Sequence, residues 1–164
     1  ASHFWAILIG IDAYASNPLH GCVSDTLSMK KLLLENVGVP EHRIQCLLGA
    51  RKPPHGDPLT PSHANIVKLL HSLFDNPEIE RGNNIIYYTG HSSSYHCSEH
   101  FSTPLESKCS SSDACPIEAL CPIDHDTIDA DGHPIPDISD RELNSLFTKI
   151  SHVKGHKITF ITDC

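Results

Sequence analysis

Apolar and polar residues follow two patterns along the chain, one typical of strands and one of helices, and the alternation of these patterns predicts an α/β fold. Residues 4–11 form an unbroken apolar run, a pattern typical of a strand that is buried on both faces of a sheet. Shorter apolar runs, bounded by turn-forming residues, predict further strands at 44–48, 84–88, 117–123 and 157–161. Continuous runs of this kind, rather than strict alternation, indicate parallel strands covered on both sides.

The segments between these strands carry the periodicity of amphipathic helices. A first helix is predicted over 24–37, with Ser24 as its cap and Gly38 at its end. A second helix begins at Thr60, and a third follows Ser139, which opens a capping box. The apolar stripes of these last two helices are Ile66, Leu69, Leu70, Leu73 and Phe74, and Leu143, Leu146, Phe147 and Ile150.

Strands that alternate with helices predict one domain over residues 1–164, a three-layer sandwich of a mostly parallel sheet with helices on both faces. Residues 92–116 predict an exposed, irregular insertion, because they are rich in Ser and Cys and poor in large aliphatic side chains. In such folds ligands bind beyond the carboxyl ends of the strands. His91 and Cys164 each directly follow an apolar strand, so we expect both at that edge.

Charge and cysteine content indicate which partners to expect and in which cellular compartment the protein lies. The chain has 12 Lys and Arg against 20 Asp and Glu, a net charge of −8, and no basic cluster that would favour a nucleic-acid partner. No apolar run is long enough to predict a membrane span. Seven cysteines, several of them in apolar runs, favour a reduced, cytoplasmic protein with free thiols. A secreted domain held by disulfides is the alternative.

The two strand ends carry the residues of a thiol peptidase. Such an enzyme needs a thiolate, a histidine that activates it and later protonates the leaving amine, and donors for the oxyanion. Gly90-His91 follows one strand and Asp163-Cys164 follows another, so a histidine and a thiol are predicted at the same edge. His91 is the candidate base, and a purely structural histidine is the alternative.

Five segments resemble the large-subunit half of metacaspase-type caspase domains, particularly those of mushroom-forming fungi, in order and in spacing. They are Leu19–Asp25, Tyr87–His91, Ala119–Asp124, Ile135–Leu143 and Ile158–Cys164. The resemblance implies a caspase-hemoglobinase-like fold, incomplete on its C-terminal side, and a cysteine endopeptidase with a Cys/His dyad that includes His91. It also implies a role in programmed cell death and a partner, the small-subunit half of the same parent chain. Without that half, the last strand is expected to leave an exposed edge.

The same resemblance places the nucleophile near the end of the chain. In the family the nucleophile lies two residues after an Asp, in an Asp-x-Cys-His-Ser-Gly segment. Asp163 takes the place of that Asp and Cys164 the x position, so the nucleophile is expected at the residue after Cys164. The chain alone is then expected to be inactive. In the alternative register Cys164 is itself the nucleophile, but it then follows the Asp by one residue instead of two.

Metacaspases cleave after Arg or Lys, which implies peptide substrates with a basic residue before the scissile bond. The implied substrate-binding residues are Cys22, Asp25, Thr89 and Asp163. Partly buried carboxylates hold a guanidinium by charge-assisted, bidentate hydrogen bonds. Alternatively, Cys22 is a small buried apolar side chain and Asp25 a charge that favours a helix start. Several family members are calcium-activated, but the acidic segment 124–140 lacks a calcium-loop spacing, so no ligand is assigned.

Two features keep other classes of function open. Ser92 stands where the family usually has Gly, and a positive φ there would cost a serine about 1 kcal/mol and misplace donors near the oxyanion. This departure, together with the expected absence of the nucleophile from the chain, motivates the alternative of a non-catalytic, caspase-like interaction or regulatory module. A zinc-binding structural domain is a further alternative, although its candidate residues form no Cys-x-x-Cys pair. Those residues are His96, Cys97, His100, Cys109, Cys115 and Cys121.

Overall fold

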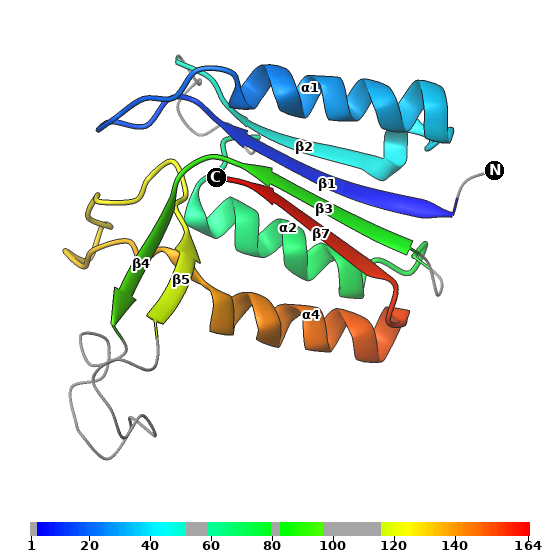
Figure 1. Ribbon diagram of the computed structural model, residues 1–164. Helices are drawn as coiled ribbons and strands as arrows, with labels where there is room; N and C mark the ends of the chain where they lie inside the picture. The colour runs from blue at the N-terminus through cyan, green and yellow to red at the C-terminus, as the bar shows by residue number, and fades with distance from the viewer. Residues whose placement is uncertain (1–2, 52–58, 80–82, 97–115) are drawn as a thin grey trace.

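The computed structural model describes residues 3–51, 59–79, 83–96 and 116–164. Four strands form a parallel sheet in the order β2-β1-β3-β7 (Figure 1). In chain order, β1, β2, β3 and β7 span Phe4–Ile11, Ile44–Gly49, Asn83–Thr89 and Ile158–Asp163. Each lies within two residues of a predicted strand at both ends, so the predicted parallel sheet is confirmed.

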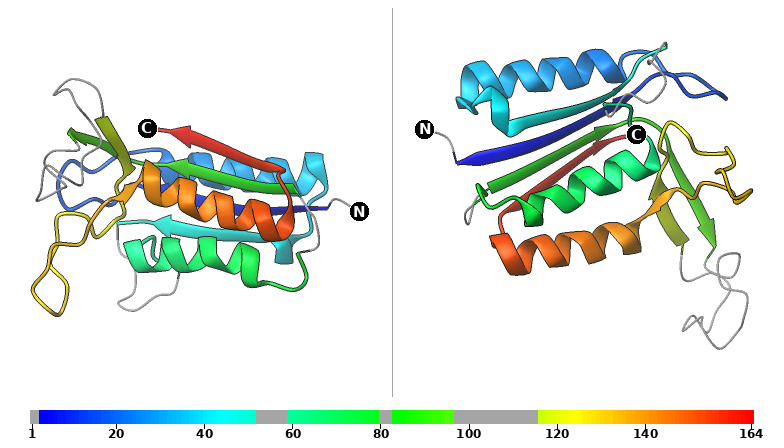
Figure 2. Two further views of the ribbon diagram at one scale, coloured as in Figure 1. Left: turned by 90° about the horizontal axis from the view of Figure 1, so that it is seen from below. Right: turned by 180° about the vertical axis from the view of Figure 1, so that it is seen from behind.

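Helices cover both faces of this sheet (Figure 2). Helix α1 (Cys22–Leu32) lies on one face and continues into a π-helical turn, η1 (Leu33–Val37). Helices α2 (His63–Asp75) and α4 (Asp140–Lys154) lie together on the other face, and a 3-10 turn, η2 (Glu41–Arg43), leads into β2. The predicted three-layer α/β sandwich is therefore confirmed. Within the described part of the chain, no helix has the length and apolar character needed to cross a bilayer.

Strand β1 lies at the centre of the fold because its side chains enter both cores. The larger core lies between the sheet and the α2–α4 layer, and it takes Trp5, Ile7, Ile9 and Ile11 from β1. The smaller core, on the α1 side, takes Ala6 and Leu8. Since successive strand residues point to opposite faces, burial on both sides explains the unbroken apolar run that starts the chain.

A second, antiparallel sheet lies beside the carboxyl ends of the main strands. It consists of β4 (Ser92–His96), β5 (Pro116–Leu120) and β6 (Ile138–Ser139), in the order β4-β5-β6. Two residues separate the end of β3 from the start of β4, and there the chain turns away from the main sheet (Figure 1). The small sheet thus frames the edge where His91 lies.

The expectation of an irregular insertion was wrong for its first five residues, which form β4 and pair with β5. Exposed Ser92 and Ser94 alternate with half-buried Ser93 and Tyr95, which is the period of a strand. Three consecutive serines hide that period, because they differ in burial and not in hydropathy. The last residue of the predicted insertion, Pro116, begins β5, and the residues between, 97–115, lie outside the described residues.

Two of the three helix starts differ from the prediction. Helix α1 begins at Cys22, and Ser24 does not cap it but donates its hydroxyl to a carbonyl of the preceding turn at 2.8 Å. Helix α2 is capped by Ser62 rather than by Thr60, and α4 by Ser139 as predicted. The two capping hydroxyls accept backbone N–H groups at 3.3 and 3.2 Å.

Strand β7 forms one edge of the main sheet. It pairs with β3 on one side, and no other described strand pairs with its outer side. Four of its six residues are exposed, and Ile161 keeps 37% of its surface in contact with solvent. An edge with unpaired backbone groups and an exposed branched side chain is suited to accept a further strand.

Gly10 gives a test of how tightly α1 packs on β1. A Cβ at this position would lie 2.2 Å from Thr26 Oγ1 and 2.7 Å from the Cys22 carbonyl oxygen. We expect Gly10→Ala to lower the free energy of unfolding by about 1–3 kcal/mol, measured by denaturant titration. Adding Thr26→Ala should restore only part of this loss, because the carbonyl stays in place.

The control for this test is Ser28→Ala, at an exposed position of the same helix. It should change the free energy of unfolding by no more than about 0.5 kcal/mol. A Gly10→Ala variant as stable as the parent protein would contradict the close approach of α1 to β1.

Candidate active site

The pairing of β3 with β7 brings the two predicted strand ends together. Thr89 and Asp163 are register partners, and the Gly90 N–H donates to the Asp163 carbonyl at 3.3 Å. His91 follows Gly90, and the exposed Cys164 follows Asp163. The expectation that these strand ends lie side by side is confirmed, whereas the catalytic roles of His91 and Cys164 stay predictions.

The side chain of His91 is held in one orientation by contacts on two sides. Its Nε2 lies 2.7 Å from the Asn17 carbonyl oxygen. Its ring lies against the ring of Tyr14, with 4.5 Å between ring centroids and an interplanar angle of 47°. Because a carbonyl oxygen only accepts hydrogen bonds, this contact requires the proton on Nε2. Nδ1 therefore keeps the lone pair and is the basic atom of the ring.

Asn17 reaches His91 through an uncommon backbone conformation. Its φ is 52°, in the left-handed region, which Asn tolerates better than most residues. Pro18 follows it, and residues before proline normally adopt extended conformations instead. Strained backbone of this kind is often found at functional sites. The Asn-Pro pair predicts a turn from the sequence. It does not reveal that the Asn17 carbonyl contacts His91.

Two buried tyrosines hold the backbone around His91. The His91 N–H donates to the Tyr14 hydroxyl at 2.9 Å, and the Tyr88 hydroxyl lies 2.6 Å from the His91 carbonyl oxygen. The two hydroxyls lie 3.1 Å apart, and each lies 2.9 Å from the Cys121 carbonyl oxygen. Burial raises the pKa of Tyr14 to about 12, although the Tyr88 hydrogen bond opposes the shift. Both phenols therefore act as neutral hydrogen-bonding groups at ordinary pH.

The four predicted substrate-binding residues gather near the hydroxyl of Tyr87, on the α1 side of the sheet. The pKa of Tyr87 is raised, chiefly by burial and then by the carboxylates of Asp163 and Asp25, while a hydrogen bond with Thr89 lowers it. The Cys22 thiol interacts with Thr89 as well. Asp25 and Asp163 are both exposed. The structure thus brings the four together, with two carboxylates open to solvent, while their role in binding substrate stays a prediction.

Asp12 is a part of this region that the sequence did not reveal. Its two carboxylate oxygens accept the backbone N–H groups of Cys22 at 2.9 Å and Val23 at 3.4 Å, and so it caps α1 from the end of β1. Burial raises the pKa of the Cys22 thiol, a hydrogen bond with Thr89 opposes the shift, and the Asp12 carboxylate adds to it. Cys22 is therefore a neutral, protonated wall of the site.

The metal predictions have a mixed outcome. Four of the six residues in the alternative zinc site lie outside the described residues: Cys97, His100, Cys109 and Cys115. In the acidic segment, Asp124 accepts the N–H of His63 at 2.8 Å, and Asp129 accepts two N–H groups of its own turn. Among described residues, the one group of three metal-ligating side chains contains a thiol, and so it does not fit calcium, which prefers oxygen. Calcium activation stays a prediction.

These observations define a class of protein: a caspase-like α/β domain, with a histidine and a cysteine at neighbouring strand ends of a parallel sheet. The sequence profile of the family described as metacaspase, peptidase C14 domain, matches residues 5–164, and the chain belongs to this family. The resemblance drawn from five sequence segments is thereby confirmed. Membership implies a caspase-like cysteine peptidase, and it leaves substrate preference to be established.

Two comparisons show how far the similarity extends. The chain is 28% identical to metacaspase-3 of Arabidopsis thaliana over 159 residues, which cover 96% of this chain and 38% of that protein. The crystal structure of a protein from Geobacter sulfurreducens matches with a TM-score of 0.59 and 13% identity, covering 97% of this chain and 48% of that one. This second likeness shows the fold alone. The chain spans less than half the length of either protein.

The tyrosine pair gives a test of the framework around His91. Tyr14→Phe removes the acceptor of the His91 N–H and a donor to the Cys121 carbonyl, so we expect the free energy of unfolding to fall by about 1–3 kcal/mol. Tyr87→Phe, whose hydroxyl is less buried, should cost less. Equal losses in the two variants would contradict a special role for the Tyr14 hydroxyl.

The same hydroxyl predicts a pH dependence of stability. The pKa of Tyr14 rises from 10.0 to about 12 on folding, so the folded state binds the phenolic proton more tightly than the unfolded state. The contribution is fully present below pH 10 and is lost as the pH rises through about 12. The unfolding free energy of the parent should fall more steeply than that of Tyr14→Phe over this window, as measured by chemical denaturation.

Proposed function

We propose that the protein carrying this chain is a cysteine endopeptidase in which His91 is the general base. The observation that supports this most directly is the contact of His91 Nε2 with the Asn17 carbonyl oxygen at 2.7 Å. It leaves a basic Nδ1 at the edge where β7 ends, and it fixes the ring in one tautomer. Orientation of a catalytic histidine through its second nitrogen is the logic of catalytic triads.

The nucleophile proposed is the residue after Cys164, with Cys164 itself as the alternative. His91 Nδ1 removes the thiol proton, and the thiolate sulfur attacks the carbonyl carbon of the scissile bond. The imidazolium then returns the proton to the leaving amine as the carbon–nitrogen bond breaks. Water, activated by the same Nδ1, hydrolyses the thioester and releases the free enzyme. The cytoplasm, where thiols stay reduced, is the compartment proposed for this chemistry.

We propose further that the enzyme cleaves after Arg or Lys. Asp25 and Asp163 place two exposed carboxylates close to the strand end, and Cys22 adds a neutral wall rather than a competing charge. A guanidinium between two carboxylates makes charge-assisted hydrogen bonds that an acidic or apolar side chain does not make. Thr89 is in register with Asp163 and offers a hydroxyl.

The outer edge of β7 supports a partner in the small-subunit half of the same parent chain. This edge has no partner among the described strands, and the exposed Ile161 lies on it. A strand added there would continue the sheet past the residue that follows Cys164. It would also cover the open side of the proposed site.

The alternative of a non-catalytic module loses one of the two observations that motivated it, the serine at position 92. Ser92 lies in β4, where it pairs with Leu120. Among the described residues other than glycine, positive φ occurs at Asn17 and Asp126. The backbone at Ser92 therefore does not need glycine, and the serine causes no strain there.

The dyad is tested on the full-length protein with fluorogenic peptides that end in Arg, Lys or Asp. We expect cleavage after Arg and Lys and a loss of about 100-fold or more in kcat for His91→Ala, because the thiol loses its base. His152→Ala, an exposed position near the end of α4, serves as the control and should leave kcat unchanged. Full activity of His91→Ala would exclude the dyad.

The pocket is tested by removing one charge at a time. Asp163→Asn and Asp25→Asn keep the shape of the side chain, and each should lower kcat/KM for Arg substrates by about 10- to 100-fold, the value of one charge-assisted hydrogen bond. Asp75→Asn, at the exposed end of α2, is the matched control and should have no effect. Preference for Asp over Arg in the parent enzyme would rule out the pocket.

A further inference from the structure

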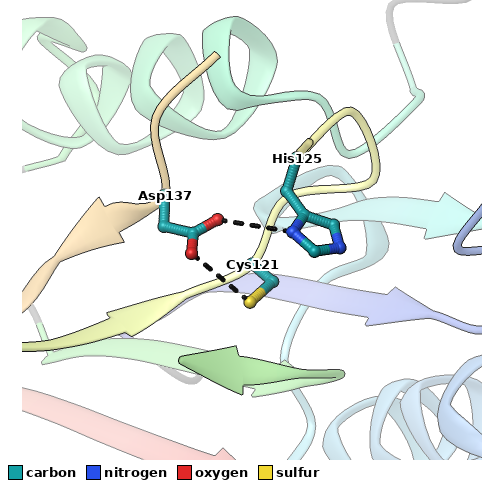
Figure 3. A group of neighbouring side chains, drawn as sticks. All are labelled: Cys121, His125 and Asp137. Carbon is teal, nitrogen blue, oxygen red and sulfur yellow. Dashed lines mark hydrogen bonds and ion pairs between the residues drawn. The ribbon is translucent and has the colours of Figure 1, made fainter. Parts of the chain in front are cut away.

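A second group of chemically reactive side chains lies next to Tyr14, whose ring contacts both His91 and His125. Cys121 directly follows β5, His125 lies in the turn that comes next, and Asp137 directly precedes β6. Figure 3 shows the three side chains converging from these separate segments, with the carboxylate between the thiol and the imidazole. Cys121 is buried, and the other two are partly buried. Neither the proposed dyad nor the proposed pocket uses any of them.

The ligand atoms of this group lie close enough together to converge on one ion. Cys121 Sγ lies 3.7 Å from Asp137 Oδ2, and His125 Nδ1 lies 3.8 Å from Asp137 Oδ1. The ligand atoms of the three residues all lie within 4.8 Å of one another. Around a tetrahedral zinc ion, with bonds of about 2.0–2.3 Å, neighbouring ligand atoms are separated by about 3.3–3.6 Å. The two contacts of Asp137 end on different oxygens of its carboxylate, so ligand atoms that lie up to 4.8 Å apart need to move closer by up to about 1.5 Å on binding an ion.

We infer that Cys121, His125 and Asp137 form a binding site for a zinc ion. A thiolate, an imidazole and a carboxylate are the three ligand types that zinc accepts in proteins. The thiol disfavours calcium and magnesium, which take oxygen ligands. Three protein ligands leave the fourth tetrahedral position for water. The inference goes beyond the proposed peptidase function and does not depend on it.

The surroundings hold the three ligands in place. Ser93 Oγ donates to Asp137 Oδ2 at 2.5 Å, the kind of outer contact that orients a metal-binding carboxylate. The rings of His125 and Tyr14 meet edge to face, with 5.6 Å between centroids. Asp126 also approaches His125 Nδ1, at 3.5 Å, but its side chain is 77% exposed, and so it is free to turn away when an ion binds.

The location gives the ion a structural role beside the active site. The ligands stand at both ends of the segment 121–137, so an ion would fasten this segment to the small sheet. The Cys121 N–H donates to the His91 carbonyl at 3.0 Å, and Tyr14 touches both His91 and His125. Occupancy would therefore stabilise the framework that holds His91, in addition to stabilising the fold.

The test is a titration of the full-length, reduced, metal-free protein with Co²⁺, which takes zinc sites and reports thiolate ligation by a sulfur-to-cobalt charge-transfer band. We expect the band to form with one equivalent of Co²⁺, to vanish when Zn²⁺ is added, and to survive Ca²⁺. Cys121→Ser should abolish it. His125→Ala and Asp137→Asn should weaken binding at least about tenfold. Zn²⁺ at a hundredfold excess over its Kd should raise the melting temperature by about 5 °C or more.

Control variants separate this site from other thiols. Cys46→Ser, a half-buried thiol on β2, should keep the band, as should His91→Ala and a triple variant with Cys97, Cys109 and Cys115 changed to Ser. Loss of the band in His91→Ala would place the ion at the dyad and overturn the inference. The inference would also be overturned if the triple variant lost the band while Cys121→Ser kept it. If Cys121→Ser fails to fold, the His125→Ala variant tests the site instead. An unchanged affinity of His125→Ala for Co²⁺ would also overturn the inference.

Discussion

The site depends on one pairing, that of β3 with β7, between segments separated by some seventy residues of sequence. Parallel strands cannot be joined by a short turn, so the intervening chain must leave the sheet and return. Part of it forms the small β4–β5–β6 sheet, and part forms α4, which packs on the face that also carries α2. Because β3 and β7 end in register at Thr89 and Asp163, the next residues of both strands share one edge. The proposed dyad and the proposed pocket both depend on this register.

The second constraint is the polar node formed by Tyr14 and Tyr88 inside an otherwise apolar core. Buried hydroxyls are costly unless they are hydrogen-bonded, and here both are, through backbone groups of His91 and Cys121. The node joins the loop after β1, the end of β3 and the end of β5. A histidine that follows a strand is thereby fixed in backbone position, and the Asn17 carbonyl fixes its ring. Packing and hydrogen bonding thus position one side chain from two directions.

Sequence patterns predicted the elements well, and the contacts between them poorly, for physical reasons. The apolar runs and helical stripes are local signals, and they located all four main strands and the three helices. Strand β4 was missed because serine is neutral in hydropathy, so its alternation in burial leaves no trace. His91 was found because glycine and a strand flank it. Asp12, Tyr14 and Asn17 were missed because their partners lie ten to more than seventy residues away.

Among the described residues, three thiols lie near this end of the sheet, those of Cys22, Cys121 and Cys164, and they differ in exposure. Burial and the Asp12 carboxylate keep the pKa of Cys22 high, after allowance for the opposing Thr89 hydrogen bond, and burial and Asp137 raise that of Cys121 to about 11. Since the thiolate is the nucleophile, both are poor competitors for a peptide carbonyl at neutral pH. Cys164, at the end of β7, is exposed instead. Burial therefore argues against Cys22 and Cys121 as the nucleophile, in agreement with the proposal that it lies at the end of β7. A zinc ion at Cys121 would have to displace the thiol proton, because the metal ligand is also the thiolate.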